Sequence, residues 1–207
     1  MELLLSYAAF GAIALLAAMS PGPDFLVVSK NSISHSRSVG VWTAIGVALG
    51  NCVHVGYTLI GIGLIISQSI IVFSMVKIAG AIYLIYLGVQ LMTENEEAKV
   101  PTENSSEEIT KRGAFKQGFL TNVLNPKATL FFVSVFSQFV SPKLSIGTRS
   151  LFGIEAIVII GSWFVLLAFI LTYPAIRRVI GRIQTKLLKV MGAGLLLLGV
   201  KLGLSQQ

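Results

Sequence analysis

The sequence predicts an all-α membrane protein in which six transmembrane helices form two inverted three-helix repeats, with the first and fourth helices broken. Three observations support this prediction. Of the 207 residues, 54% are hydrophobic and only 12% are charged, which is about half the charged share of a soluble domain. The apolar residues form six long blocks instead of short alternating strands. Two of these blocks contain a proline followed by a charged residue, which interrupts a helix where an interruption is costly.

Each of the six apolar blocks is long enough to cross a hydrocarbon core of about 30 Å. The blocks comprise residues 3–29, 39–66, 69–93, 115–140, 150–173 and 186–204. Glycine pairs predict close helix packing in the second block, at Gly46 and Gly50, and in the sixth, at Gly199 and Gly203. The first block lacks a basic region before it, so we expect a retained span and not a cleaved signal peptide.

The distribution of basic residues predicts the orientation. Eleven lysines and arginines lie in or beside the loops 30–38, 94–114 and 174–189, against three on the other side. Short loops rich in Lys and Arg stay in the cytoplasm. We therefore expect a multi-pass membrane protein with both termini outside, which in a bacterial cell means the cytoplasmic (inner) membrane with periplasmic termini. The net charge is +7, but most of the lysines and arginines lie in or beside these loops, where they act as topology signals, so we expect no nucleic-acid partner.

The loop 94–114 is the one sizeable polar segment, with six glutamates and Pro101. Because no apolar periodicity crosses it, we expect a flexible linker. It divides a single membrane transporter domain, residues 1–207, into repeat one at 1–93 and repeat two at 115–207. Three spans in each half require the two repeats to be inverted in the membrane, which is a common transporter design.

The first block is interrupted by Pro21, Gly22 and Pro23, and Asp24 follows directly. Proline removes a backbone hydrogen bond and clashes with the preceding turn. In lipid the freed backbone groups need protein or a wet cavity around them. A carboxylate costs about 2.5 to 3.5 kcal/mol at a helix centre, and the eleven Leu, Ile, Phe and Val residues of this block contribute about 3 to 7 kcal/mol. Asp24 can therefore insert, and it marks a candidate functional site.

The fourth block contains a matching interruption, Asn125, Pro126 and Lys127. Pairing Asp24 with Lys127 across the two broken helices is the least costly arrangement of the two charges. The N-terminus of a half-helix favours anions, and its C-terminus and bare carbonyls favour cations. We therefore predict a zwitterion site, with the ligand's carboxylate toward Lys127 and amide donors and its ammonium toward Asp24 and carbonyls. Asn122 and Asn125 add hydrogen bonds.

A structural interpretation of the same residues stays open on the sequence alone. Asp24 can cap a half-helix, and Lys127 can extend its ammonium to the cytoplasmic interface. His54, in the middle of the second block, can couple or relay a proton near neutral pH, or pack as a satisfied histidine between helices. Cys52 is the one cysteine, which excludes an internal disulfide and a paired-cysteine metal site. We expect no metal and no cofactor.

Three stretches carry a resemblance to a known family: residues 20–24 (SPGPD), 80–88 (GAIYLIYLG) and 121–128 (TNVLNPKA). They resemble the LysE/RhtB family of amino-acid exporters, and the homoserine/threonine efflux branch is the most similar. The agreement in length, spacing and apolar blocks extends over nearly the whole chain. The resemblance implies export of small amino acids from the cytoplasm, driven by the proton-motive force, by a protein that is not an enzyme.

The leading hypothesis is a secondary transporter with alternating access, whose partners are a small amino acid, protons and the lipid bilayer. Since the site holds one cation and one clear anion, neutral substrates such as threonine or homoserine are favoured over basic ones. A metal-ion exporter of related architecture is the alternative, and it would need Cys, His and carboxylate ligands gathered within the spans. An intramembrane enzyme or a structural subunit is a third class. The particular amino acid and the formation of a homo-oligomer stay open.

Overall fold

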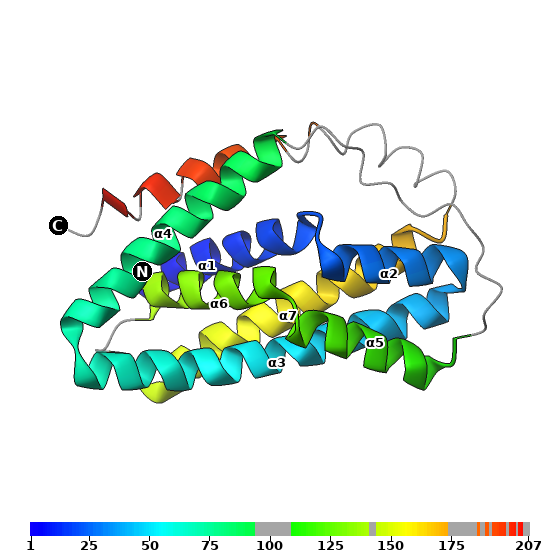
Figure 1. The fold of residues 1–207 in the computed structure, drawn as a ribbon, viewed down its shortest axis with the longest axis horizontal. Helices are drawn as coiled ribbons and strands as arrows, with labels where there is room; N and C mark the ends of the chain where they lie inside the picture. The colour runs from blue at the N-terminus through cyan, green and yellow to red at the C-terminus, as the bar shows by residue number, and fades with distance from the viewer. Residues whose placement is uncertain are drawn as a thin grey trace.

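The computed structural model describes residues 1–93, 109–140, 144–173 and parts of 186–204, and the regular structure in these ranges is α-helical. In order, the helices are α1 (Glu2–Met19), α2 (Pro23–Ser34), α3 (Arg37–Gln68), α4 (Ile70–Thr93), α5 (Lys111–Val123), α6 (Pro126–Phe139) and α7 (Ile146–Ile170) (Figure 1). Helical residues recur between 186 and 204. Most of the expected linker and of the third basic loop lies outside the described residues.

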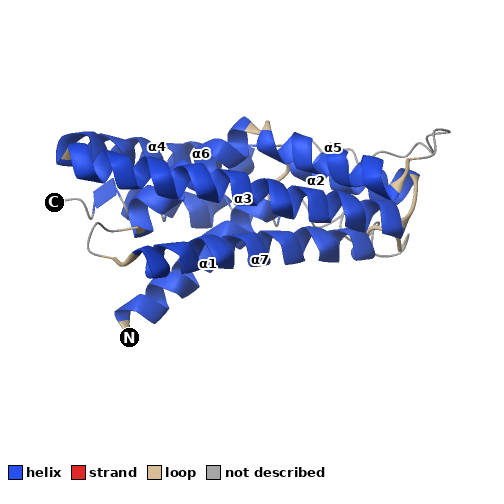
Figure 2. Ribbon diagram, turned by 90° about the horizontal axis from the view of Figure 1, so that it is seen from below, coloured by secondary structure: helices blue, strands red, loops and turns tan. Residues whose placement is uncertain are grey.

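The helices lie side by side in one elongated bundle (Figure 2). The long helix α3 packs against α2, α5, α6 and α7, and α1 packs against α7 and α6. Helix α4 packs on α6, and the described C-terminal helical residues run alongside it (Figure 1). The chain thus places α2, α5 and α6 beside the central helix α3, whereas α1 packs on α7 and α6.

Three described helices are long and apolar enough to cross a membrane: Glu2–Met19, Arg37–Gly61 and Ile146–Ile170. Helices α5 and α6 supply a fourth span if the pair, which bends by 56°, is taken as one. The apolar stretch Ser74–Gln90 of α4 is shorter. An all-helical, multi-pass membrane protein is therefore confirmed, whereas the count of six spans in two inverted repeats stays a prediction.

The expected loop 30–38 is a short turn, because α2 continues to Ser34 and α3 follows almost at once. Hydropathy missed this extension since the added turn of helix buries polar side chains. Asn31 is fully buried, and its Nδ2 donates to Thr43 Oγ1 at 2.8 Å and to Gln117 Oε1 at 2.9 Å. Polar partners on α3 and α5 thus replace water for this end of α2.

Helices α5 and α7 begin about one turn earlier than the apolar blocks predict. In each case a hydroxyl side chain caps the helix. Thr110 Oγ1 accepts the N–H of Gly113 at 3.1 Å, and Ser145 Oγ accepts the N–H of Thr148 at 3.2 Å. Caps of this kind satisfy backbone donors that the first turn leaves free, so the helices extend into sequence that hydropathy assigns to loops.

The glycine pair of the second block allows α5 to approach α3 closely, as expected. A Cβ atom on Gly46 would collide with the backbone carbonyl oxygen of Phe115. A Cβ atom on Gly50 would lie 2.5 Å from Asn122 Oδ1 and 2.9 Å from Asn122 Cβ. Real Cβ atoms do not come so close, so both positions need a residue without a side chain for the helices to pack.

The second glycine pair is confirmed in part. A Cβ atom on Gly199 would lie 2.8 Å from Ile85 Cγ1 and 2.9 Å from Ile85 N, so this glycine permits close packing on α4. At Gly203 the nearest such contact is 3.8 Å, to Ala81 Cβ. That distance is an ordinary van der Waals contact, so Gly203 is not required for the approach.

An aromatic cluster fills the bundle between α1, α6 and α7. The ring of Phe10 lies edge-on to Phe136 and Phe152, with centroids 5.4 and 5.1 Å apart, and it also contacts Phe139. Edge-to-face packing is the favoured arrangement of aromatic rings. In the predicted orientation this cluster lies between the two helix breaks and the outer end of the bundle.

Candidate functional site

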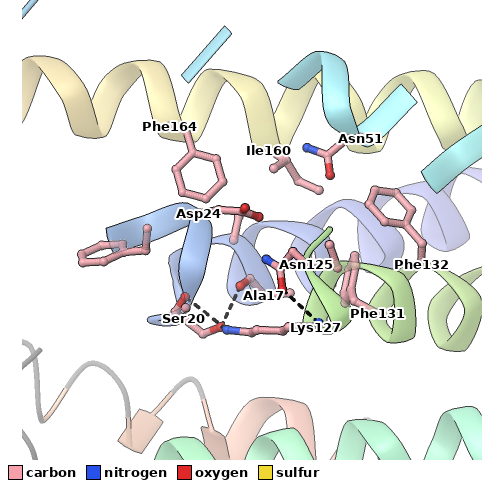
Figure 3. Close-up of a pocket in the computed structure, with 14 residues that line it drawn as sticks. Ala17, Ser20, Asp24, Asn51, Asn125, Lys127, Phe131, Phe132, Ile160 and Phe164 are labelled. Atoms are coloured by element: carbon pink, nitrogen blue, oxygen red, sulfur yellow. Dashed lines mark hydrogen bonds between the residues drawn. The ribbon is translucent and has the colours of Figure 1, made fainter. Parts of the chain in front are cut away.

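Two helix breaks approach each other near the centre of the bundle (Figure 3). Helix α1 ends at Met19 and α2 begins at Pro23, while α5 ends at Val123 and α6 begins at Pro126. Proline starts the second half-helix in both cases, where its missing N–H leaves no hydrogen bond unmade. The predicted interruptions of the first and fourth blocks are therefore confirmed at the predicted residues.

Lys127 lies in the first turn of α6 and reaches across to the end of α1 (Figure 3). Its Nζ donates to the carbonyl oxygens of Ser20 at 3.3 Å and Pro21 at 2.8 Å, and it also contacts Ser20 Oγ. These carbonyls lie at the negative end of α1, where a helix favours a cation. A Cβ atom on Gly22 would lie only 3.2 Å from Lys127 Cδ. The ammonium is therefore held inside the protein instead of extending to the interface.

Asp24 lies in the first turn of α2 and is positioned by amide groups. Its Oδ2 accepts a hydrogen bond from Asn122 Nδ2 at 2.9 Å. The same Nδ2 lies 3.3 Å from Asn51 Oδ1 on α3, and the side chain of Asn125 also faces the carboxylate. Among the described residues, Asp24 Oδ1 is buried without a hydrogen-bond partner. One carboxylate oxygen is thus fixed and the other is available to a ligand.

The two charges predicted to form a pair lie in one pocket and within electrostatic range of each other. Their hydrogen bonds differ from the prediction, however. Lys127 donates to carbonyls of the first break, whereas Asp24 accepts from Asn122. We predicted that carbonyls at the break would bind the ligand's ammonium. Lys127 binds these carbonyls instead, because its side chain is long enough to reach them.

His54 stands behind Asn122, away from the pocket lining. Its Nε2 lies 2.8 Å from the backbone carbonyl oxygen of Asn122 and its Nδ1 lies 2.6 Å from the Tyr57 hydroxyl. The fully buried ring stacks on Phe132 with centroids 5.6 Å apart. Because a carbonyl oxygen can only accept, Nε2 carries the hydrogen of this contact. His54 therefore binds the C-terminal end of α5 one residue before that helix ends.

A pocket lies at the two breaks and opens to solvent, and the space between atoms in and around it is about 420 Å³. Its polar lining residues are Ser20, Asp24, Asn51, Asn125 and Lys127. Its apolar lining residues other than glycine are Ala17, Ala18, Phe25, Ala128, Phe131, Phe132, Ile160 and Phe164. Figure 3 shows Phe164 and Ile160 across the pocket from Lys127, with Asp24 between them. The pocket thus presents a carboxylate and an ammonium together with apolar side chains.

The predicted site residues fall into three groups. The pocket is lined by Gly22, Asp24, Asn125 and Lys127. The breaks are formed by Pro21, Pro23 and Pro126. Behind Asp24 stand Asn122 and His54. The structure therefore brings all nine together, and their roles in binding or coupling stay predictions.

The sequence analysis missed Asn51 and Tyr57 as candidate site residues. Both belong to the polar face of α3 that His54 also occupies, because the three residues are spaced three apart and so lie on neighbouring turns. This spacing of polar residues within an apolar block was the available signal. What it could not show is that this face points at α5 and not at lipid.

A helical membrane bundle with two broken helices around a buried, charged pocket defines the class of the protein: it is a membrane transport protein. The model of the family described as LysE type translocator matches residues 15–206, and the chain belongs to that family. The predicted family is thus confirmed, and with it the expectation of a transporter and not an enzyme.

The relatives agree with this assignment. The chain is 35% identical to the threonine efflux protein of Escherichia coli (strain K12), an alignment that covers 79% of this chain and 81% of the relative. It is 33% identical to the threonine efflux protein of Salmonella typhi over the same shares. An uncharacterized membrane protein of Bacillus subtilis, YrhP, is 28% identical over 97% of this chain and 99% of its own length. No solved structure matches the chain.

Proposed function

We propose that the protein exports small neutral amino acids of the threonine and homoserine kind from the cytoplasm, across the bacterial inner membrane, by proton antiport. The observation that carries the proposal is the single pocket in which Asp24 and Lys127 meet at two helix breaks. An amino acid is a zwitterion and needs an anion and a cation at short range. The relatives named threonine efflux proteins support the same substrate class.

The geometry suggests how the zwitterion would bind. Its ammonium would bind Asp24 Oδ1, which is buried and has no hydrogen-bond partner among the described residues. Its carboxylate would lie toward Lys127 and the first turn of α2, where no side chain of the described residues caps the helix at Gly22. The N-terminus of a helix with free N–H groups favours an anion.

The rest of the pocket supports a neutral side chain. Once the ligand's two charges are bound, no charged group of the pocket lining remains for its side chain. Ile160 and Phe164 lie across the pocket from Lys127. Burying an unpaired side-chain charge against these apolar side chains is unfavourable, which disfavours lysine-like and glutamate-like substrates.

Alternating access would follow from two inverted repeats, residues 1–93 and 115–207, that rock around the pocket. The supporting observation is that the two breaks are built alike, with a proline starting α2 and α6 and a charged residue directly after it. Corresponding broken helices at the midplane are typical of inverted-repeat transporters. In this arrangement six spans leave both termini outside, and Asp24 with His54 couples protonation to substrate release.

The alternative, a metal-ion exporter, has less support. Within the described residues no three His, Cys, Asp or Glu side chains gather into a group that could hold a metal ion. Cys52 is exposed, and the Asn122 amide stands between Asp24 and His54. Metal sensitivity of a deletion strain would show a metal exporter, and unchanged sensitivity supports the amino-acid proposal.

Counterflow in proteoliposomes tests the proposal. Vesicles loaded with threonine, homoserine, leucine, lysine or glutamate are diluted into labelled threonine, and uptake of label is measured. We expect exchange with the neutral amino acids and little with lysine or glutamate. Exchange with none of the five would refute an amino-acid exporter, and preferential exchange with lysine would refute the neutral substrate class.

An Asp24→Asn variant is expected to lower export about tenfold or more, because a hydrogen bond to a charged group contributes about 1.5 to 3 kcal/mol. The asparagine keeps the shape of the side chain and removes the anion that binds the substrate's ammonium. Export is measured in cells fed a threonine-containing dipeptide. Glu2→Gln, which neutralises an exposed carboxylate in the first turn of α1, is the control, and equal export by the two variants would contradict the role of Asp24.

An Asn51→Ala variant tests the positioning of Asp24 by the amides behind it. Without the Asn51 oxygen, the amide of Asn122 loses one of its two acceptors and is free to turn. We expect about a fivefold to tenfold lower rate of counterflow, since a hydrogen bond of this kind contributes about 1 kcal/mol. Thr58→Val is the control on the same helix, because Thr58 Oγ1 is buried without a partner in the described part of the chain. Equal rates would place Asn51 outside the site.

A further inference from the structure

A chain of four residues connects an exposed position on α3 with the pocket. Tyr57 is 38% exposed, whereas His54 is fully buried. The Tyr57 hydroxyl contacts His54 Nδ1 at 2.6 Å, and His54 Nε2 contacts the carbonyl oxygen of Asn122 at 2.8 Å. The side chain of Asn122 then donates to Asp24 Oδ2 at 2.9 Å. The order is therefore Tyr57, His54, Asn122, Asp24.

The contacts define where a proton can enter this chain. Nε2 carries a hydrogen and donates it to the Asn122 carbonyl, so in the neutral imidazole Nδ1 is the free base and accepts the Tyr57 O–H. A proton that arrives from outside can bind the Tyr57 oxygen while the original hydroxyl proton passes to Nδ1. Tyr57 stays neutral and His54 becomes an imidazolium, so that the pair gains one proton and one positive charge.

The same contacts define where the proton stops. Beyond His54 the chain consists of a peptide carbonyl and a side-chain amide, neither of which accepts and passes on a proton near neutral pH. His54 therefore holds a proton instead of relaying it to Asp24. The positive charge on His54 can still act on Asp24, because the two side chains lie within electrostatic range of each other.

Among the described residues, the contacts of His54 and Asn122 lead to one carboxylate. Phe132 of α6 stacks on the imidazole, and Tyr57 is the titratable partner on α3 itself. Asp24 of α2 is the carboxylate that Asn122 of α5 contacts. Lys127, the other charged group of the pocket, donates to the carbonyls at the end of α1. The charge on His54 therefore acts chiefly on Asp24.

We propose that Tyr57 and His54 form the proton-binding site of the transport cycle, separate from the substrate pocket, with Tyr57 as the residue through which His54 exchanges its proton. This inference rests on the proposed proton-coupled export. Tyr57 lies on the half of α3 that points to the predicted outer side, so loading takes place from outside. An imidazolium behind Asn122 attracts the Asp24 carboxylate and weakens its hold on the substrate's ammonium, which releases the substrate outward.

The test compares two activities of the same proteoliposomes. Counterflow of threonine at equal pH measures binding and exchange, and transport driven by a pH gradient measures coupling. In Tyr57→Phe we expect the ratio of gradient-driven transport to counterflow to fall about tenfold. We also expect the pH midpoint of transport to move to more acidic pH, since hydrogen bonds with an ionised partner are about twice as strong as neutral ones and the variant loses one. The phenylalanine keeps the ring and removes only the hydroxyl.

Tyr83→Phe is the matched control. The Tyr83 hydroxyl donates to the backbone carbonyl oxygen of Lys127 at 3.2 Å, so this variant also removes a tyrosine hydroxyl near the pocket but leaves the Tyr57–His54 contact intact. Its ratio of gradient-driven transport to counterflow and its pH midpoint of transport are expected to equal those of the parent. A displaced midpoint in both variants would mean that Tyr57 acts only through the general stability of the site, and would overturn the proposal.

His54→Gln gives a second, independent measurement. The glutamine amide can still donate toward the Asn122 carbonyl but cannot carry the charge, so stimulation of transport by the pH gradient is expected to disappear. Full stimulation in His54→Gln, or a parental ratio and midpoint in Tyr57→Phe, would refute the inference while leaving amino-acid export intact. Failure of the parent protein itself to perform counterflow would instead refute the proposed function.

Discussion

A Lys127→Met variant is expected to lose export by about a hundredfold or more and to unfold at a lower temperature than the parent. Methionine is nearly as long as lysine and can lie against Gly22 as the lysine stem does. What it cannot do is donate to the carbonyls of Ser20 and Pro21. Transport rates in proteoliposomes and thermal unfolding in detergent are the two measurements.

The size of the effect follows from the position of these carbonyls. Each charged hydrogen bond contributes about 1.5 to 3 kcal/mol, and in a membrane the freed carbonyls have no water to replace the donor. The loss of these two hydrogen bonds therefore costs about 3 kcal/mol or more, which is at least a hundredfold in an equilibrium. Asp24 also loses its nearby cation. Stability and transport thus decline together.

Lys116→Met is the control for this prediction. Lys116 is an exposed lysine of α5, and its substitution removes the same charge from the chain without touching either break. We expect parental transport and a parental unfolding temperature. If Lys127→Met behaved like Lys116→Met in both assays, the ammonium of Lys127 would have no part in holding the first break or the substrate.

A Gly118→Val variant is expected to reduce the amount of folded protein in the membrane more than tenfold. Gly118 lies on the face of α5 that packs against α3, and a Cβ atom there would collide with the backbone carbonyl oxygen of Thr43, with Thr43 Cα only 3.1 Å away. Backbone atoms cannot move aside as a flexible side chain can. The helices would have to separate, and overpacking of a close contact costs about 1 to 3 kcal/mol even where side chains can adjust.

Separation of α3 from α5 would also dismantle the site. Asn122 follows Gly118 by about one turn on the same face of α5, and it makes its contacts with Asn51 and His54 across this interface. The small fraction of variant protein that reaches the membrane should therefore show little transport. Quantitative immunoblotting of membranes and size-exclusion chromatography in detergent measure the accumulation.

Gly56→Val is the matched control on α3. In the described part of the chain no atom lies within 4 Å of a Cβ atom built on Gly56, so valine there has space and also restricts the unfolded chain. We expect parental accumulation. Similar losses in Gly56→Val and Gly118→Val would show that valine itself, and not the contact with Thr43, is responsible.

The two breaks and their charges could be predicted from the sequence because proline acts locally. A proline inside an apolar helical block breaks or kinks the helix, as at Pro23 and Pro126, and a charge beside such a break is rare enough to indicate function. The direction in which Lys127 points could not be predicted. It depends on the carbonyls of Ser20 and Pro21, which lie more than a hundred residues away in the chain.

The role of Asn122 shows the same division in one residue. From the sequence alone, Asn122 is a candidate hydrogen-bonding residue of the site, because it lies just before the break in the fourth block. That its side chain holds Asp24 while its backbone carbonyl holds His54 requires α5 to lie against α3 at the distance that Gly46, Gly50 and Gly118 allow. Asn51 and Tyr57 were missed because the sequence does not show which helix their polar face of α3 packs against.

By itself the sequence determined the helical membrane class, the two broken helices, the pocket residues that lie at those breaks and the family, because hydropathy, proline geometry and motif spacing are local properties. Only the tertiary structure decided the partners: Lys127 on the end of α1, Asp24 on the amide of Asn122, and His54 between Tyr57 and the end of α5. These partners depend on which helix faces meet across the bundle. Close packing of glycines against the backbone of the facing helix determines which faces meet.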